Sequence, residues 1–291
     1  MMNAMTGLCD ARSAPNEFVE INGRRLAYRS VGEGRPILLC VRFRGNMDSW
    51  DPAFLDGLAA EGFRAIVFDY SGLGLSSGVP TYDPSEMVRD PLDLIEALQL
   101  KEVVIAGWSL GGLVAQIVVA SKPGQVTHAV LIGCGPPGPL VKTAEQLFYD
   151  TAGIEVYGLE EEEILFFEPK SARSRAAAQA SVARIASRTE ARSRPVPIAF
   201  ARAKLGSGPR NPSFPADHVL EALKTTDLPI LHIGGDHDII FPVENWYALN
   251  GQLPTVQLLT YPSAGHGPQH EHPEASAAHI AAFVRSTRSA I

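Results

Sequence analysis

Short apolar runs alternate with amphipathic stretches along most of the chain. The runs at 36–41, 64–69, 102–106 and 126–132 are largely continuous, as expected of strands that are buried on both faces of a sheet. Helical patterns lie between them, at 51–60, 84–99 and 110–122. Strands that alternate with helices of this length predict right-handed crossovers and a mostly parallel sheet. Residues 17–31 alternate around Asn22-Gly23, which predicts an antiparallel hairpin before the first crossover.

The alternation stops near Gly133 and is followed by Pro-Pro-Gly-Pro at 136–139. Residues 140–226 show helical patterns and no convincing buried strand, and the strand–helix pattern then resumes until a last helix at 273–287. We therefore expect one α/β domain, made of residues 16–139 and 227–291, that carries a helical insertion at 140–226. Residues 1–15 are mixed and polar and are expected to form a flexible leader.

The apolar run at 102–106 ends in the sequence G-W-S-L-G, residues 107–111, and a helical pattern follows at once. A strand, this glycine-flanked serine and a helix form the layout of a nucleophile elbow. The turn holds the serine backbone in a strained conformation, and only residues without a Cβ allow the strand and the helix to close around it. Ser109 is therefore the candidate nucleophile, and the N–H of Leu110 is a candidate donor to an oxyanion.

A serine hydroxyl needs a general base, which is usually histidine. His266 lies in a glycine-flanked loop after the last expected strand, at the carboxyl edge of the sheet where ligands bind. A metal site of His266, His270 and His272 lacks an acidic or cysteine partner at ligand spacing, and the simpler reading makes the latter two solvated loop residues. Asp236 and Asp238, after the strand at 229–234, are candidates for the acid that orients the base.

These motifs resemble the α/β-hydrolase superfamily, in its capped members with a serine nucleophile. The matching pieces are the elbow, the loop D-Y-S-G-L-G-L-S at 69–76, the acid turn at 235–242 and Gly265-His266-Gly267. In that family the acid is usually the aspartate four residues before the proline of the acid turn, which favours Asp238 over Asp236. The resemblance also implies that residues 140–226 form the family's variable cap over the active site.

One stretch departs from the family pattern. The family usually carries His-Gly after the third strand, whereas this chain has V-R-F-R-G at 41–45. The second oxyanion donor is expected from 42–44, and we assign it to Phe43. Arg42, with Trp108, could contact the substrate, and its guanidinium could bind a carboxylate through two N–H groups. The alternative is that Arg42 pairs internally with an acid such as Asp69, and the cost of an unpaired buried guanidinium favours that role.

The insertion is divided by charge, with glutamates at 155–168 and a basic stretch at 170–210. Such runs are usually solvated helix faces, but the basic part could also attract anionic substrates. Its aromatic residues could line an apolar pocket or hold the cap to the sheet. These residues are Phe148, Phe166, Phe167 and Phe200.

Composition and charge narrow the possible partners, cellular location and cofactors of the protein. A net charge of -7 makes nucleic acid an improbable partner, and no apolar run is long enough to cross a bilayer. Three widely spaced cysteines indicate a reducing, cytoplasmic setting without a disulfide framework. No cofactor or metal is expected, because the chain has no P-loop and no G-x-G-x-x-G after its first strand. The sequence does not predict the oligomeric state.

The resulting hypothesis is a serine hydrolase that cleaves a small or medium carboxylic ester or lactone through an acyl-enzyme. One alternative keeps the same three residues but hydrolyses a C–C bond in a β-diketone-like substrate. Another is a ligand-binding protein of slow turnover, which the altered stretch at Arg42 would favour. Dehalogenases and epoxide hydrolases of the family use an aspartate at the elbow, so Ser109 argues against those activities.

Overall fold

A computed structural model describes residues 10–212 and 217–287. Most of the expected N-terminal leader therefore lies outside the described residues. Its last part packs on the core: Ala11 and Ala14 are buried, and the N–H of Ala11 donates to Asp56 at 2.8 Å.

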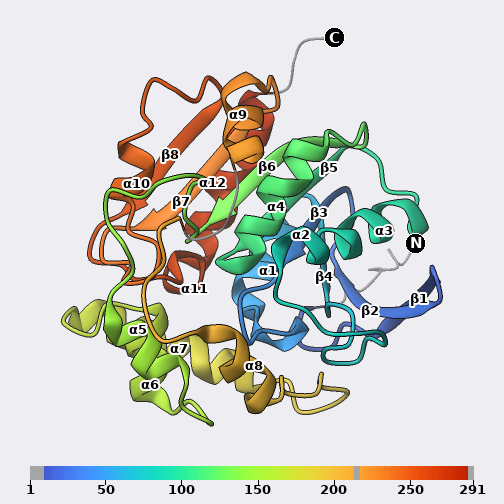
Figure 1. Cartoon of the computed structure of the whole chain (residues 1–291). Helices are drawn as coiled ribbons and strands as arrows, with labels where there is room; N and C mark the ends of the chain where they lie inside the picture. The colour runs from blue at the N-terminus through green and yellow to red at the C-terminus, as the bar shows by residue number, and fades with distance from the viewer. Residues whose placement is uncertain (1–9, 213–216, 288–291) are drawn as a thin grey trace, which may run out of the picture.

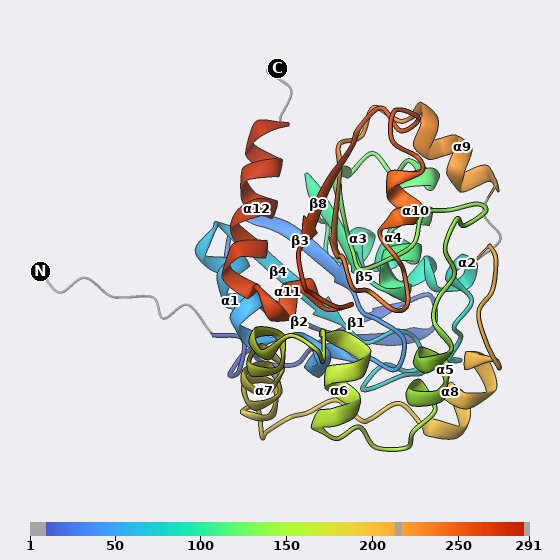
Figure 2. The ribbon, with the colours of Figure 1, turned by 90° about the vertical axis from the view of Figure 1, so that its left-hand side faces the viewer.

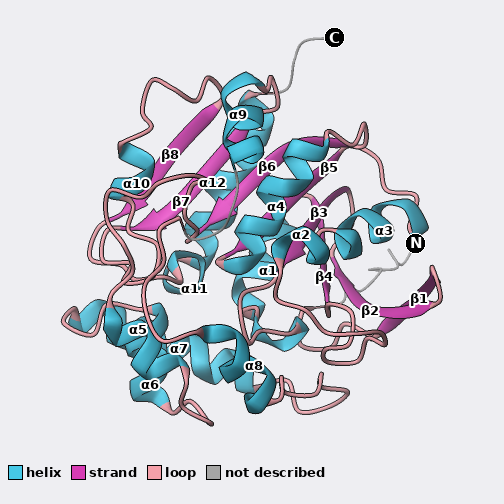
Figure 3. Ribbon diagram, viewed as in Figure 1, coloured by secondary structure: helices cyan, strands magenta, loops and turns pink. Residues whose placement is uncertain are grey.

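Eight strands form one sheet in the order β1-β2-β4-β3-β5-β6-β7-β8 (Figures 1 and 3). The hairpin of the first two strands is antiparallel, β2 is antiparallel to β4, and every other pairing is parallel. The strands are β1 (Glu17–Ile21), β2 (Arg24–Val31), β3 (Arg35–Cys40), β4 (Phe63–Phe68), β5 (Val103–Trp108), β6 (Val126–Ile132), β7 (Ile230–Gly235) and β8 (Val256–Tyr261). This sheet confirms the expected α/β-hydrolase fold class.

Helices cover both faces of the sheet, as Figure 2 shows edge-on. One face carries α1 (Pro52–Ala60), α11 (Pro268–Glu271) and α12 (Pro273–Ser286). The other carries α2 (Pro84–Met87), α3 (Arg89–Ala97), α4 (Leu110–Ser121), α9 (Asp217–Thr225) and α10 (Glu244–Tyr247). The central strands β5 and β7 are buried along their whole length, because helices on both sides exclude water from them.

The helical insertion lies beyond the carboxyl ends of the strands, at the bottom of Figure 1. It contains α5 (Gln146–Ala152), α6 (Leu159–Phe166), α7 (Ala172–Ala186) and α8 (Ile198–Leu205). The helix that follows them, α9, packs on α4 of the core and not beside these four (Figure 1). We call α5–α8 with their connections the cap. Among the described residues, no helix is long and apolar enough to cross a membrane.

Buried charges attach the cap to the core. Arg184 of α7 donates to both carboxylate oxygens of Asp51, at 2.6 to 3.1 Å. Burial is the largest single influence on the pKa of Asp51 and would raise it, but the hydrogen bonds from Arg184, together with smaller contributions from His270, Ser181 and the N–H of Ala53, leave the pKa lowered. Asp48 accepts from Arg29 of β2 at 2.5 Å and from the N–H of Ser193, which follows α7, at 2.7 Å. Ion pairs and hydrogen bonds to Asp48 and Asp51 therefore add to the apolar contacts that attach the cap to the core.

Candidate active site

Ser109 stands between β5 and α4 in a conformation that side chains rarely adopt, with φ 59° and ψ −122°. The flanking glycines allow this turn. A Cβ on Gly107 would lie 2.0 Å from the carbonyl oxygen of Gly111, and one on Gly111 would lie 2.0 Å from that of Cys40. No larger residue fits at either position without moving the backbone. The sequence at 107–111 therefore forms the predicted elbow, at the carboxyl edge of the sheet.

His266 and Asp238 meet on the loops that follow β8 and β7. Nδ1 of His266 lies 2.8 Å from Oδ2 of Asp238, and both side chains are buried. The other carboxylate oxygen accepts the N–H groups of Ile240 and Phe241, at 2.8 and 2.9 Å. Backbone donors thus fix the carboxylate, which in turn can hold one ring orientation and tautomer of His266.

Asp236, the other candidate acid, lies outside this pair. Its side chain is 39% exposed and hydrogen-bonds the ring of the neighbouring His237 at 2.6 Å. Of the two aspartates of the acid turn, it is Asp238 that contacts His266.

Trp108 positions the histidine loop. Its indole Nε1 donates to the carbonyl oxygen of His266 at 2.8 Å, across the end of the sheet. Gly133, at the end of β6, lies against the same loop, since a Cβ on Gly133 would be 2.5 Å from the carbonyl oxygen of His266. The contacts of the described residues include no hydrogen bond between Ser109 and His266. Catalytic hydrogen bonds are often long before substrate binds and shorten in the complex.

Two free N–H groups lie at the cavity of the serine, one from Phe43 in the stretch after β3 and one from Leu110 at the start of α4. Phe43 and Leu110 line the same cavity as Ser109, and the N–H of neither has an acceptor among the described residues. Tyr82 supports this stretch: its hydroxyl accepts the N–H of Arg44 at 3.0 Å, and its ring packs on Phe43. The arrangement matches the two donors that an oxyanion hole requires.

The cavity at Ser109 measures about 400 Å³ and is mainly apolar. Core and cap both contribute to its walls. The lining residues include Phe43, Tyr82, Leu110, Leu113, Leu140, Phe148, Leu205, Ile240 and Phe241. Lys204 and Arg210 are the cations that line it, and both come from the insertion. We call it the apolar cavity.

Residues 35–273 match the family described as alpha/beta hydrolase fold. The chain belongs to this family of hydrolases. An alpha/beta hydrolase fold protein from Chitinophaga pinensis is 29% identical, with a TM-score of 0.81 over 95% of this chain and 99% of that one. The esterase RhEst1 from Rhodococcus sp. ECU1013 is 25% identical, with a TM-score of 0.70 over 94% of this chain and 99% of that one. The non-heme chloroperoxidase CPO-A1 of Kitasatospora aureofaciens is 26% identical, over 84% of this chain and 90% of that protein.

The expected ion pair between Arg42 and Asp69 of this hydrolase is wrong. Asp69 is buried, and its carboxylate accepts from the N–H groups of Met47 and Leu75 and from the hydroxyl of Ser193, at 2.6 to 2.8 Å. Burial raises the pKa of Asp69, and these donors oppose that effect. The hydrogen bonds that the Asp69 carboxylate accepts therefore fix the loop at 69–76 and the end of the cap.

The expectation that His270 and His272 are solvated is also wrong. His270 is buried against Trp108, with ring centroids 4.6 Å apart, and burial lowers its pKa to about 4. The ring of His272 stacks on Tyr261 at 4.4 Å. His270 is therefore neutral at pH 7, and its Nε2 accepts the N–H of Asp51 at 3.3 Å.

The aromatic residues of the cap serve both of the expected roles. Phe148 lines the apolar cavity, whereas Phe200 packs on Tyr82 and Phe166 packs on Trp108. Phe167 lies against the histidine loop, because a Cβ on Gly265 would be 2.3 Å from its carbonyl oxygen.

We call residues 42–44 the oxyanion stretch. Arg44, which no motif in the sequence singles out, links this stretch to the cap. Its guanidinium donates to the carbonyl oxygens of Ala152, Ile154 and Glu155, at 2.6 to 2.8 Å. Its backbone has φ 57°, an unusual value for a residue with a Cβ. The signal in the sequence was a second arginine, two positions after Arg42, in the stretch that departs from the family's His-Gly.

Proposed function

We propose that this hydrolase cleaves small or medium carboxylic esters, open or cyclic, through an acyl-enzyme on Ser109. The observation that carries the proposal is the buried contact between His266 and Asp238, at the sheet edge where the elbow presents the serine. The free N–H groups of Phe43 and Leu110 and the apolar cavity beside them support it.

The reaction would start with transfer of the Ser109 hydroxyl proton to Nε2 of His266 as Oγ attacks the ester carbonyl carbon. The carbonyl oxygen becomes negative and accepts the N–H groups of Leu110 and Phe43. His266 then gives its proton to the departing alkoxide, which leaves an acyl group on Ser109. A water molecule, deprotonated by His266, attacks this acyl group and releases the acid and the free serine.

Asp238 supports both steps without taking up a proton. Its carboxylate stabilises the imidazolium that forms when His266 is protonated, and it keeps Nδ1 as the donor so that Nε2 faces the serine. Because two backbone N–H groups hold the carboxylate, this orientation is present before the substrate binds. The apolar cavity would receive the hydrocarbon part of the ester.

A fluorophosphonate probe tests the assignment of the nucleophile, because it reacts with activated serines only. We expect stoichiometric labelling of Ser109, a burst of p-nitrophenol from p-nitrophenyl valerate and loss of both on Ser109→Ala. Labelling at another serine in the folded protein would contradict the proposal. A burst followed by almost no turnover would instead indicate the slow-turnover alternative.

A further inference from the structure

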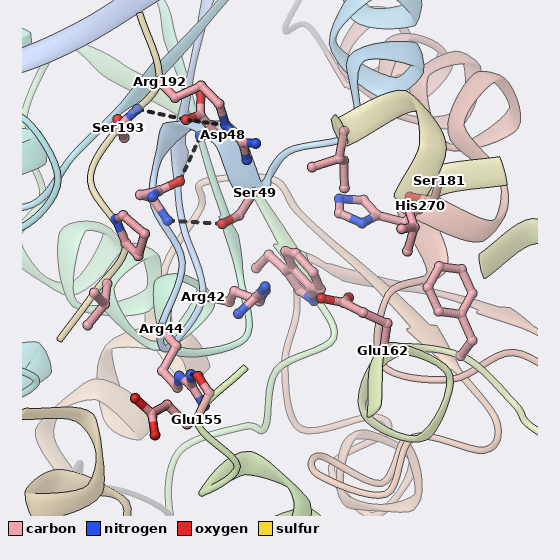
Figure 4. Close-up of a pocket in the computed structure, with 17 residues that line it drawn as sticks. Arg42, Arg44, Asp48, Ser49, Glu155, Glu162, Ser181, Arg192, Ser193 and His270 are labelled. Atoms are coloured by element: carbon pink, nitrogen blue, oxygen red, sulfur yellow. Dashed lines mark hydrogen bonds and ion pairs between the residues drawn. The ribbon is translucent and has the colours of Figure 1, made fainter. Parts of the chain in front are cut away.

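A second cavity lies between the core and the cap, and Trp108 is one of its lining residues. Figure 4 shows this cavity. It measures about 510 Å³, which is enough for a functional group of a small substrate. Its lining is polar and charged, unlike that of the apolar cavity. The lining residues include Arg42, Arg44, Asp48, Ser49, Glu155, Glu162, Arg192, Ser193 and His270. We call it the polar cavity.

Arg42 is the arginine of this cavity that has neither an ion pair nor a full set of hydrogen bonds among the described residues. Among the described residues, no carboxylate oxygen lies within 4.0 Å of its guanidinium. Nη1 donates to the carbonyl of the adjacent Phe43 at 2.9 Å, and Nε is buried without an acceptor. The side chain instead lies over the rings of Phe166 and Trp108, at 4.3 and 5.3 Å.

The other arginines of the cavity have more partners. The guanidinium of Arg44 is occupied by three carbonyl oxygens of the cap. Asp48 is bound to Arg29, and Arg192 lies 3.6 Å from the same carboxylate. Burying an arginine without a partner costs several kcal/mol, because its hydration is lost and not replaced. Rings that accept a cation offset only part of that cost.

Glu162 of α6 faces the same space, as Figure 4 shows. Its carboxylate makes no hydrogen bond or ion pair with the described residues. Burial raises its pKa, although the charges of Arg42 and Arg44 oppose the shift. Glu162 therefore acts on Arg42 only from beyond contact distance, and it would repel an anion placed beside the arginine.

We propose that the polar cavity is a carboxylate subsite in which Arg42 binds an anionic ligand through paired N–H groups. The planar guanidinium fits a carboxylate in this way, and a carboxylate would supply the acceptor that Nε lacks. Arg42 adjoins Phe43 in sequence, and Trp108 adjoins Ser109, so neighbouring residues of the chain line the polar cavity and the apolar cavity. This inference rests on the proposed function and adds to it a ligand class, molecules that carry a free carboxylate.

The carboxylate could belong to the ester itself or to a free acid that binds separately. Two p-nitrophenyl esters distinguish these sources: the hemiglutarate and the valerate, whose acyl chains are of similar length but end in a carboxylate or a methyl group. If the carboxylate belongs to the substrate, the hemiglutarate has the lower KM and free glutarate competes with it. If a free acid binds separately, glutarate changes the kcat of valerate hydrolysis instead.

Binding is measured first without catalysis, by calorimetry with glutarate on the Ser109→Ala protein. We expect binding that Arg42→Met weakens about tenfold or more, as for the loss of hydrogen bonds to a charged group. Glu162→Gln should tighten it, because it removes the opposing charge. Arg25→Met is the matched control, since Arg25 is exposed on β2 and also stacks on a ring, that of Phe18, at 4.5 Å.

The outcomes separate the subsite from the reaction. No glutarate binding at millimolar concentration, or binding that neither Arg42→Met nor Glu162→Gln changes, overturns the subsite even if esters are hydrolysed. Binding that depends on Arg42, without hydrolysis of either ester, keeps the subsite and contradicts the ester reaction. If Arg42→Met does not fold, as judged by circular dichroism, the tighter binding expected of Glu162→Gln decides the question.

Discussion

The apolar cavity and the polar cavity, both of which lie between the core and the cap, are built in opposite ways. At the apolar cavity, the elbow contains close backbone contacts that only glycine allows, and backbone N–H groups hold Asp238. The catalytic groups beside this cavity therefore belong to the rigid core. Charged side chains from the core and the cap form the polar cavity, and their positions depend on how the cap docks. The difference suggests that the core determines the reaction, whereas the contact between core and cap determines the substrate.

The largest expected effect is confined to the apolar cavity. Ser109→Ala removes the nucleophile, and kcat for p-nitrophenyl valerate should fall by about 10⁴-fold or more. The melting temperature should change little, because the small residue keeps the turn. If the comparison between the cavities holds, the same variant still binds glutarate. Residual activity within tenfold of the parent would show that another group attacks the ester.

The next effect tests the two acids of the acid turn. Asp238→Asn should lower kcat by about 10⁴-fold, because the amide would favour the wrong tautomer of His266. Asp236→Asn is the matched control, since the same substitution two residues away removes a charge that contacts His237 and not His266. Equal losses in both variants would contradict the role given to Asp238.

A smaller effect is expected from a change of Arg44, whose side chain lines the polar cavity and whose backbone belongs to the oxyanion stretch. Without its three bonds to cap carbonyls, the oxyanion stretch at 42–44 should shift, and we expect Arg44→Met to lower kcat about 10- to 100-fold. KM for p-nitrophenyl valerate should change less, because the apolar walls remain. Arg202→Met is the control, since Arg202 also donates to a cap carbonyl, that of Gly153 at 2.8 Å, but does not contact the stretch. Equal effects of both variants would make Arg44 only a support of the cap.

The core could be predicted from sequence far better than the cap. Buried parallel strands read as apolar runs, and the glycines at 107 and 111 mark a turn that few other structures need. Each signal lies within a few consecutive residues. The sheet, the elbow and the place of His266 at the sheet edge could therefore be predicted from these signals, whereas the choice of Asp238 over Asp236 rested on the resemblance to the family.

The contacts between core and cap join residues that are far apart in sequence. Arg184 meets Asp51, and Arg44 meets carbonyl oxygens at 152–155, but no local pattern indicates either pairing. The pairing of Arg42 with Asp69 was wrong for the same reason. Asp69 was the nearest plausible acid, and the donors that occupy it include Ser193, on a remote segment of the cap.

The smallest expected effect concerns Glu162, whose pKa is raised in the folded protein by burial. Between the unfolded pKa, near 4.3, and the higher folded value, the folded state binds more protons than the unfolded state. Stability should therefore fall as pH rises through this window. Glu162→Gln should remove that slope, so its stability relative to the parent improves with rising pH in urea titrations. Glu160→Gln is the control, because Glu160 occupies the same first turn of α6 but is exposed. If stability depended on pH in the same way in both variants, the Glu162 carboxylate would not be desolvated in the folded protein. The polar cavity would then be as open to water as the surface of the cap.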